Sequence, residues 1–417
     1  MVAIFIIGYI LIALEEFIKI SKSAIALITG VLCWTILFLQ DTGLTPSYEL
    51  INHLGEIGGI LFFLIGAMTI VEIMDAHDAF NVITQRIQTK NKKILALIIV
   101  LLSFFLSAVL DNLTTTIVAV SIVLKIVQDS KDRILFSSLI VVAANAGGAW
   151  SPIGDVTTTM LWMGNQITTG AIIQHSFLPS LISVAIPFIA LSFQLKGNVM
   201  DNNILQPPSI SSSKHATLFL ITGISSLLFV PLFKSWTGLP PFMGMLLALG
   251  LVWLLSEFID RNKDEEEKHH TSINHLLKKI DTPSILFFLG ILLAVSALST
   301  AGILNSFSNI LNTLTSDFHN TTMLLGLSSA VLDNVPLMAA AQQMYDLHVF
   351  ATDHPFWILL AYTTGTGGSL LIIGSAAGVA AMGMTKIKFF WYLKHITLWV
   401  LLGYMVGWWI LSMTLGG

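Results

Sequence analysis

Two aspartates occupy the same place in a repeated six-residue motif. Ser-Ala-Val-Leu-Asp-Asn runs from Ser107 to Asn112 and again from Ser329 to Asn334, so that Asp111 and Asp333 correspond. Both lie among apolar residues, where an unpaired charge in a bilayer costs at least ~2.5 kcal/mol. A bound cation or a proton would neutralise that charge, so we expect both carboxylates to exchange protons for cations. The alternative is a surface turn, because Asp-Asn is common in turns.

A glycine-rich segment follows each motif further along the chain. Residues 145–155 are Asn-Ala-Gly-Gly-Ala-Trp-Ser-Pro-Ile-Gly-Asp, and residues 365–375 are Gly-Thr-Gly-Gly-Ser-Leu-Leu-Ile-Ile-Gly-Ser. Such residues interrupt a helix, and lipid cannot replace the lost hydrogen bonds, so the break must face protein or a water-filled cavity. The exposed carbonyls and helix ends are ready ligands for a cation. Asp155 has Ser375 at the matching position, so the two halves cannot be equivalent.

Oxygen donors surround these three carboxylates, as a hard monovalent cation requires. The sequence therefore predicts a proton and cation exchange site at Asp111, Asp333 and Asp155. The candidate cation ligands are Asn112, Thr114, Thr115, Asn145, Gly147, Ser151, Thr157, Thr158, Ser329, Asn334, Thr366 and Ser369. For any single Ser or Thr, helix packing is the alternative, because small polar residues are common between membrane helices.

Glu72, Asp75 and His77 form a second polar group at the end of an apolar run. They are candidates for pH sensing, because histidine titrates near neutral pH; a solvated helix end is the alternative. The sequence contains no phosphate-binding loop, zinc-ligand spacing, nucleophile elbow or nucleic-acid footprint, so it predicts neither an enzyme nor a cofactor nor nucleic-acid binding. The single cysteine, Cys33, excludes an intramolecular disulfide.

The elements that must position these residues lie in a membrane. Hydrophobic residues make up 55% of the 417-residue chain and charged residues only 11%, and apolar runs recur that are long enough to cross a ~30 Å hydrocarbon core. Ten crossings are predicted near residues 1–18, 24–39, 55–75, 134–163, 176–195, 215–233, 239–259, 284–302, 356–384 and 395–413. The first lacks a cleavage signal and is expected to be retained.

The basic residues predict the orientation of these crossings. All of them except Lys234 fall on one side of the ten-crossing arrangement, and that side is therefore cytoplasmic by the positive-inside rule. Both termini are then expected outside.

The repeated motifs and breaks predict an all-α polytopic membrane protein built from two copies of one unit. Each copy has four crossings, and a single crossing separates them, so the copies have inverted topology. The apolar segments beside the second motif are too short to cross and are expected to form a re-entrant hairpin. The first motif is expected to do the same by repeat symmetry, although residues 94–110 alone could just span the core. The predicted parts are an extra N-terminal helix (1–23), repeat 1 (24–195, with hairpin 94–128 and broken helix 134–163), a connecting segment with one helix (196–238) and repeat 2 (239–413, with hairpin 320–345 and broken helix 356–384).

Residues 107–116, together with residues 143–162, closely resemble the NhaD-type sodium/proton antiporters of the ion transporter superfamily. The resemblance implies secondary antiport of Na⁺ or Li⁺ for H⁺, a homodimer embedded in lipid, and a role in pH homeostasis in a bacterial cytoplasmic (inner) membrane. By motif match, functional roles are implied for Asp111, Asn112, Asn145, Asp155, Thr157, Thr158, Ser329, Asp333 and Asn334, and less directly for Thr366 and Ser369.

Two alternatives remain open from the sequence. An anion carrier of the same superfamily, an arsenite exporter or a sodium-coupled dicarboxylate transporter, is disfavoured because the predicted site holds three acids and no Lys or Arg. Helix N-termini could still bind an anion. A passive channel is disfavoured by the inverted repeat and the paired hairpins, which favour alternating access.

Overall fold

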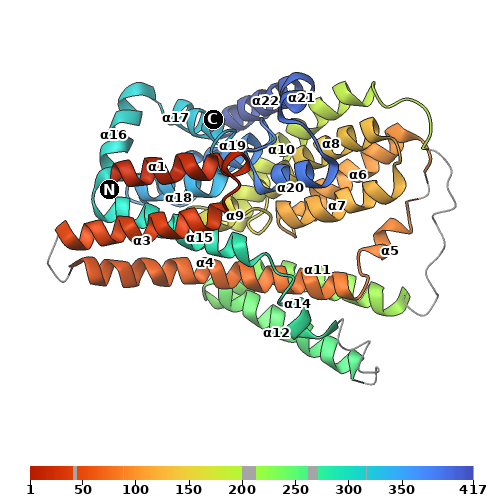
Figure 1. The fold of residues 1–417 in the computed structure, drawn as a ribbon, viewed down its shortest axis with the longest axis horizontal. Coiled ribbons are helices and arrows are strands. Elements are labelled where there is room, and N and C mark those ends of the chain that lie inside the picture. The colour runs from red at the N-terminus through yellow and green to blue at the C-terminus, as the bar shows by residue number, and fades with distance from the viewer. Residues whose placement is uncertain (41–44, 88, 200–212, 262–270, 316, 417) are drawn as a thin grey trace.

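The computed structural model describes residues 1–40, 45–87, 89–199, 213–261, 271–315 and 317–416 (Figure 1). Within these ranges the chain is helical and has no β-strand. The helices are α1 (Val2–Ala13), α2 (Glu15–Ile18), α3 (Lys22–Gln40), α4 (Thr45–Ala76), α5 (Asn81–Thr84), α6 (Lys92–Ser107), α7 (Asn112–Ile126), α8 (Ser130–Gly148), α9 (Val156–Met163), α10 (Thr169–Ser192), α11 (Ser213–Thr237), α12 (Pro241–Asp260), α14 (Ile273–Leu276), α15 (Thr282–Thr300), α16 (Ile303–Thr315), α17 (Phe318–Ser328), α18 (Asn334–Met344), α19 (Pro355–Gly367), α20 (Ala376–Thr385), α21 (Phe389–His395) and α22 (Thr397–Leu415).

Seven of these helices are long and apolar enough to cross a membrane, and the chain is a multi-pass membrane protein. They correspond to seven of the ten predicted crossings, and the other three are each divided between two helices. Two of those three are the predicted broken helices. The third is the first crossing, which divides at Leu14 between α1 and α2. The expectation of one continuous apolar helix over 1–18 was therefore wrong in this detail.

Both helix breaks fall in the glycine-rich segments. Helix α8 ends at Gly148 and α9 begins after Asp155, whereas α19 ends at Gly367 and α20 begins after Ser375. Asp155 and Ser375 have the same extended backbone and cap the helices that follow them, each accepting a backbone N–H with its side chain. The two interruptions therefore have the same local architecture.

Each motif hairpin packs its backbone directly on a broken helix. A Cβ added at Gly147 would lie 2.2 Å from the Phe104 carbonyl oxygen, and one added at Gly367 would lie 2.3 Å from the Gly326 carbonyl oxygen. Only glycine allows such an approach. Thus α6 lies against α8 and α17 lies against α19 in corresponding ways.

The serines of the two motifs make matching hydrogen bonds. Ser107 Oγ donates to the Ala144 carbonyl at 2.6 Å, and Ser329 Oγ donates to the Thr364 carbonyl at 2.8 Å. These equivalent contacts support a repeat. The inverted orientation of its copies and the boundaries of the predicted parts stay predictions, and residues 200–212 of the connecting segment lie outside the described residues.

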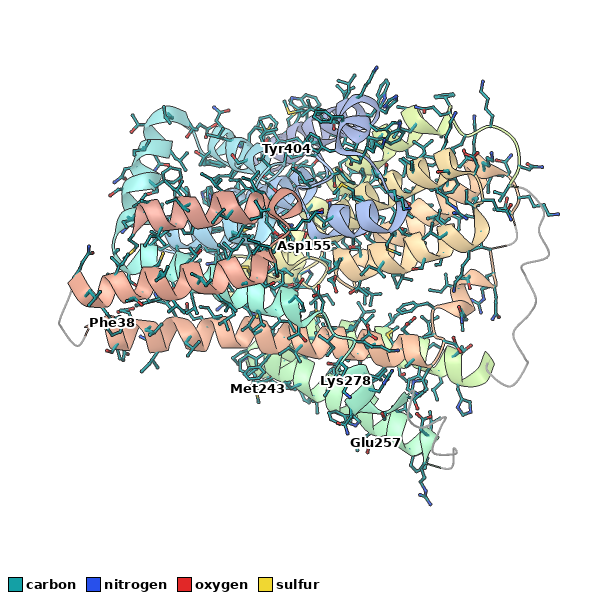
Figure 2. The ribbon with its side chains drawn as sticks, viewed as in Figure 1. Phe38, Asp155, Met243, Glu257, Lys278 and Tyr404 are labelled. Carbon is teal, nitrogen blue, oxygen red and sulfur yellow. The ribbon has the colours of Figure 1, made fainter. Side chains whose placement is uncertain are left out.

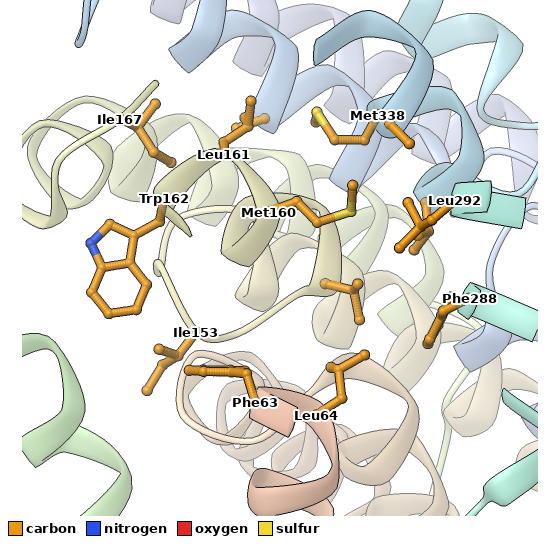
Figure 3. Close-up of a cluster of buried hydrophobic side chains, with 14 of the residues drawn as sticks. Phe63, Leu64, Ile153, Met160, Leu161, Trp162, Ile167, Phe288, Leu292 and Met338 are labelled. Atoms are coloured by element: carbon orange, nitrogen blue, oxygen red, sulfur yellow. The ribbon is translucent and has the colours of Figure 1, made fainter. Parts of the chain in front are cut away.

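Helices α3, α4, α11, α12 and α15 lie on one side of the molecule, and the motif helices lie on the other side with α8, α10 and α22 (Figure 1). Helix α4 packs on α12 and α15, and α15 packs along α3. On the other side α6, α7 and α10 surround α8, and α10 packs along α22. An apolar cluster joins the two sides: Phe63 and Leu64 of α4 and Phe288 of α15 face Met160 of α9 and Met338 of α18 (Figure 3). The interrupted segments are therefore enclosed between two helical layers.

Candidate ion-exchange site

Asp155 lies near the middle of the molecule with 1% of its surface exposed (Figure 2). Its Oδ1 accepts the backbone N–H of Thr157 at 3.1 Å, as expected for the N-cap of α9. Its Oδ2 accepts the side-chain amides of Asn112 at 3.1 Å and Asn334 at 3.4 Å. Because these asparagines begin α7 and α18, the tips of both hairpins meet on one carboxylate oxygen.

Asn145, from the end of α8, connects this carboxylate to the second broken helix. Its Oδ1 accepts the Asn112 amide at 2.9 Å, and its Nδ2 lies 2.9 Å from both Ser369 Oγ and Ser375 Oγ, to which it donates. Asn145 is completely buried. Two hairpin tips and two helix breaks therefore share one hydrogen-bonded polar network within apolar surroundings.

Asp111 and Asp333 lie beside this network as the N-caps of α7 and α18. Both oxygens of Asp111 are bound by Thr114, through the backbone N–H at 2.8 Å and the hydroxyl at 2.6 Å. Asp333 accepts the Val335 N–H at 3.3 Å with one oxygen. Among the described residues neither carboxylate is hydrogen-bonded to Asp155, so the three acids do not form one direct cluster.

A lysine forms an ion pair with the other oxygen of Asp333. This contact contradicts the expectation of a site without basic residues. Lys22 Nζ lies 3.1 Å from Asp333 Oδ2 and 4.4 Å above the centre of the Phe287 ring. The Coulomb argument against an anion is weaker as a result. Sequence reasoning missed this residue because Lys22 and Asp333 are 311 positions apart and Lys22 was counted only among the basic residues on the cytoplasmic side.

Two of the predicted cation ligands have buried hydroxyls that make no hydrogen bond within the described part of the chain. They belong to Thr115, one turn into α7, and to Thr157, whose hydroxyl lies near the Asp155 carboxylate without forming a well-aligned bond. Most buried polar groups in proteins are hydrogen-bonded, so these hydroxyls are exceptions, and their role as cation ligands stays a prediction. Within the described part of the chain no three His, Cys, Asp or Glu side chains converge on one point. The available ligand set is one carboxylate with neutral oxygens, which suits an alkali cation.

Other predicted ligands use their hydroxyls to hold the segments together. Ser151 donates to the Ala108 carbonyl, Thr158 donates to the Gly148 carbonyl at 3.2 Å, and Thr366 donates within its own helix to the Tyr362 carbonyl. Gly147 provides the close packing against α6 described above, and Ser329 the matching bond to α19. None of these hydroxyls is hydrogen-bonded to Asp155, and their role as ligands stays a prediction.

Two cavities lie beside helices that begin at the network. The first, of about 550 Å³, is lined by α9 and α18 through Met160 and Gln342, with His53 and Glu56 of α4. The second, of about 510 Å³, is lined by α7 and α20. Its charged lining residues are Lys22, Glu72, Asp75, Lys125, Lys279 and Asp281. Under the repeat, α9 corresponds to α20 and α18 to α7, so the two cavities are lined by corresponding elements.

The candidate pH-sensing group is divided in the structure. Glu72 and Asp75 line the second cavity. His77 is buried elsewhere, with Nε2 3.2 Å from Asp260 Oδ2 and its ring stacked at 3.6 Å on Phe219. The three residues therefore do not act as one constellation.

A helical, multi-pass chain with a buried polar network between helix breaks has the architecture of a membrane transporter. Residues 9–352 match the family model CitMHS, described as citrate transporter. The chain is 44% identical over 410 residues to sodium/proton antiporter 2 of Arabidopsis thaliana, spanning 98% of this chain and 97% of that protein. It is 32% identical over 437 residues to the Na(+)/H(+) antiporter NhaD of Vibrio cholerae, spanning 97% and 89%. The chain belongs to the NhaD-type sodium/proton antiporters within the citrate transporter family, which are transporters and not enzymes.

Proposed function

We propose that this protein exchanges Na⁺ or Li⁺ for H⁺ across its membrane by alternating access, with Asp155 at the centre of the exchange site. The observation that carries the proposal is the buried Asp155 carboxylate, on which Asn112 and Asn334 of both hairpin tips converge. The names of the relatives from Arabidopsis thaliana and Vibrio cholerae support the same exchange.

The asparagines give the site a way to hold either ion. An asparagine side chain carries two N–H donors and one carbonyl acceptor. In the arrangement seen here, Asn112 and Asn334 donate to Asp155 and stabilise its ionised form. Rotation of an amide would present its carbonyl oxygen to Na⁺ beside the carboxylate. A proton on Asp155 neutralises the same charge, so the two ions compete.

The burial of Asp155 also limits uncoupled movement of ions across the membrane. An ionised Asp155 with no cation would carry an uncompensated buried charge while the protein changes conformation, which is costly in an apolar environment. The sodium-bound and the protonated states both lack that charge and can change conformation. Asp111 and Asp333, next to the two asparagines, extend the site toward the second cavity and toward Lys22.

Sodium-driven proton movement tests the proposal directly. We expect added Na⁺ to dequench a pH-sensitive dye in acid-loaded everted vesicles that contain this protein. The competing function is transport of a carboxylate anion, which the lysine at Asp333 and the description of the family model favour. Proteoliposomes that accumulate citrate in a sodium gradient, with no sodium-driven proton flux, would establish that function instead.

We also propose that the repeats are inverted and that both termini face outward from a bacterial cytoplasmic membrane, in a homodimer that supports pH homeostasis. The charge asymmetry of the loops supports the orientation. Single cysteines in place of Thr89 and Asp317, in a Cys33→Ala background, should react with impermeant thiol reagents from the cytoplasmic and the external side respectively. Reaction from the same side would refute the inverted repeat.

A further inference from the structure

The two hairpin tips bind their aspartates with different groups. In the first, Thr114 provides both its N–H and its hydroxyl to Asp111. The corresponding residue of the second motif is Pro336, which has neither an N–H nor a hydroxyl. Asp333 is therefore left with the Val335 N–H and one oxygen for which its own hairpin supplies no bond.

Lys22 supplies the missing donor from outside the hairpin. It is the first residue of α3, and its backbone N–H is held by the Glu15 carboxylate at 2.9 Å. Its ammonium reaches Asp333 Oδ2 at 3.1 Å over the Phe287 ring. The side chains of Lys22 and Asp333 are 21% and 16% exposed, so the pair is largely shielded and yet reachable from the second cavity, which Lys22 lines.

We propose that Lys22 is a built-in counter-cation of the second hairpin tip, which an entering Na⁺ displaces from Asp333. The inference rests on the proposed function. The ammonium and Na⁺ have the same charge, so the exchange leaves the charge around Asp333 unchanged. A lysine suits this role because its ammonium is a compact charge on a flexible stem, and the second cavity of about 510 Å³ gives that stem room to move.

Displacement at Asp333 acts on the centre of the site through the chain itself. The next residue is Asn334, whose amide contacts Asp155 at 3.4 Å. A hairpin tip held by Lys22 thus keeps Asn334 in its donating position, and a tip released from Lys22 allows the amide to turn. Lys22 is accordingly a positioning residue that competes with the transported cation.

Chemical restoration of the charge tests this role. In a Cys33→Ala background, Lys22→Cys vesicles are treated with methanethiosulfonate ethylammonium, which rebuilds a side chain ending in an ammonium, or with the neutral methyl methanethiosulfonate. At one fixed alkaline pH, we expect the untreated and the neutral forms to reach half-maximal proton flux at about tenfold lower Na⁺ concentration, equal to ~1.4 kcal/mol. The ammonium form should return to the value of the Cys33→Ala parent.

Two further variants separate competition from support of the fold. Lys22→Arg keeps the charge and can bind a carboxylate with two hydrogen bonds, so it should raise the half-maximal Na⁺ concentration. Lys125→Met removes a charge from the same cavity and leaves Asp333 and its contacts in place. This variant should change the half-maximal Na⁺ concentration less than about twofold. An unchanged or raised half-maximal Na⁺ concentration in Lys22→Cys would overturn the inference. So would equal half-maximal concentrations after treatment with the ammonium reagent and with the neutral reagent.

The experiment on Lys22 distinguishes a failure of this inference from a failure of the proposed function. Parent vesicles without sodium-driven proton flux would refute the proposed function. Normal flux in the parent, with no sensitivity to the charge at position 22, would overturn only the role of Lys22. The sodium-induced rise in apparent Tm of the purified protein is a second readout, because a ligand that binds the folded state stabilises it. Loss of Lys22 should enlarge this rise at subsaturating Na⁺, and a smaller or equal rise would contradict the competition.

Discussion

Replacing Asp155 with asparagine should abolish exchange while leaving the fold intact. Asparagine has nearly the same shape as aspartate and is as good an N-cap, so the bond from the Thr157 N–H can persist. The variant lacks the charge that a sodium ion or a proton would neutralise. Asp155→Asn therefore separates the charge of the site from its packing.

The expected sizes of the two effects differ strongly. Removing one partner of a buried charge pair costs about 3–5 kcal/mol, which corresponds to a loss in sodium affinity of about a hundredfold or more. The fold loses roughly one neutral hydrogen bond, about 1 kcal/mol, provided that Asn112 turns its carbonyl toward the new amide. Transport should disappear in a protein whose apparent Tm has fallen by only a few degrees.

Dye dequenching in everted vesicles measures the loss, and Ser375→Ala is the matched control. Ser375 has the corresponding position in the second half, accepting the Asn145 amide and capping α20 through the Gly378 N–H. Replacing Ser375 with alanine removes the N-cap of α20, which lowers the stability by about 1 kcal/mol. The replacement removes no charge from the site, so exchange should persist. Sodium-driven proton flux in Asp155→Asn near that of the parent, or equal losses in both variants, would refute the assignment of Asp155 as the central exchange residue.

Two further predictions follow from the hairpins. Asp111→Asn and Asp333→Asn should each abolish exchange at near-normal expression, because each keeps the capping geometry and removes a titratable charge; flux retained in either variant would remove that residue from the site. Gly147→Ala should lower the apparent Tm of the purified protein, since its Cβ would lie 2.2 Å from the Phe104 carbonyl oxygen and overpacking costs about 1–3 kcal/mol or more. Gly250→Ala, where no atom lies within 4 Å of the added Cβ, is the control and should leave the apparent Tm unchanged or slightly higher.

The sequence predicted the interruptions well because their causes are local. Glycine pairs cannot stabilise a continuous helix and allow close backbone approach, and both breaks occur where the glycines are. The turns at the two motifs were also predictable, since the apolar segments beside the second motif are too short to cross a membrane and the first motif repeats its sequence. The division of the first crossing at Leu14 was missed because neither glycine nor proline marks it.

The choice of Asp155 as the central exchange residue among the three aspartates depended on long-range contacts. In the sequence Asp111, Asp155 and Asp333 are all carboxylates in apolar surroundings. Only the packing of α7 and α18 brings two amides to Asp155, and only the path of α3 brings Lys22 to Asp333. The proline at position 336, where the first motif has Thr114, was the one sequence signal that Asp333 needs an outside donor.

The dependence of sodium affinity on pH tests the central claim most directly, because a single site shared by Na⁺ and H⁺ must show competition. The half-maximal Na⁺ concentration would be measured in proteoliposomes from about pH 6.5, near neutrality, to about pH 9.5. Fewer protons compete as the pH rises, so this concentration should fall with increasing pH and level off above the pKa of the site, while the maximal rate changes less. A half-maximal concentration that does not vary with pH would show that the two ions do not share ligands, and would contradict exchange at Asp155.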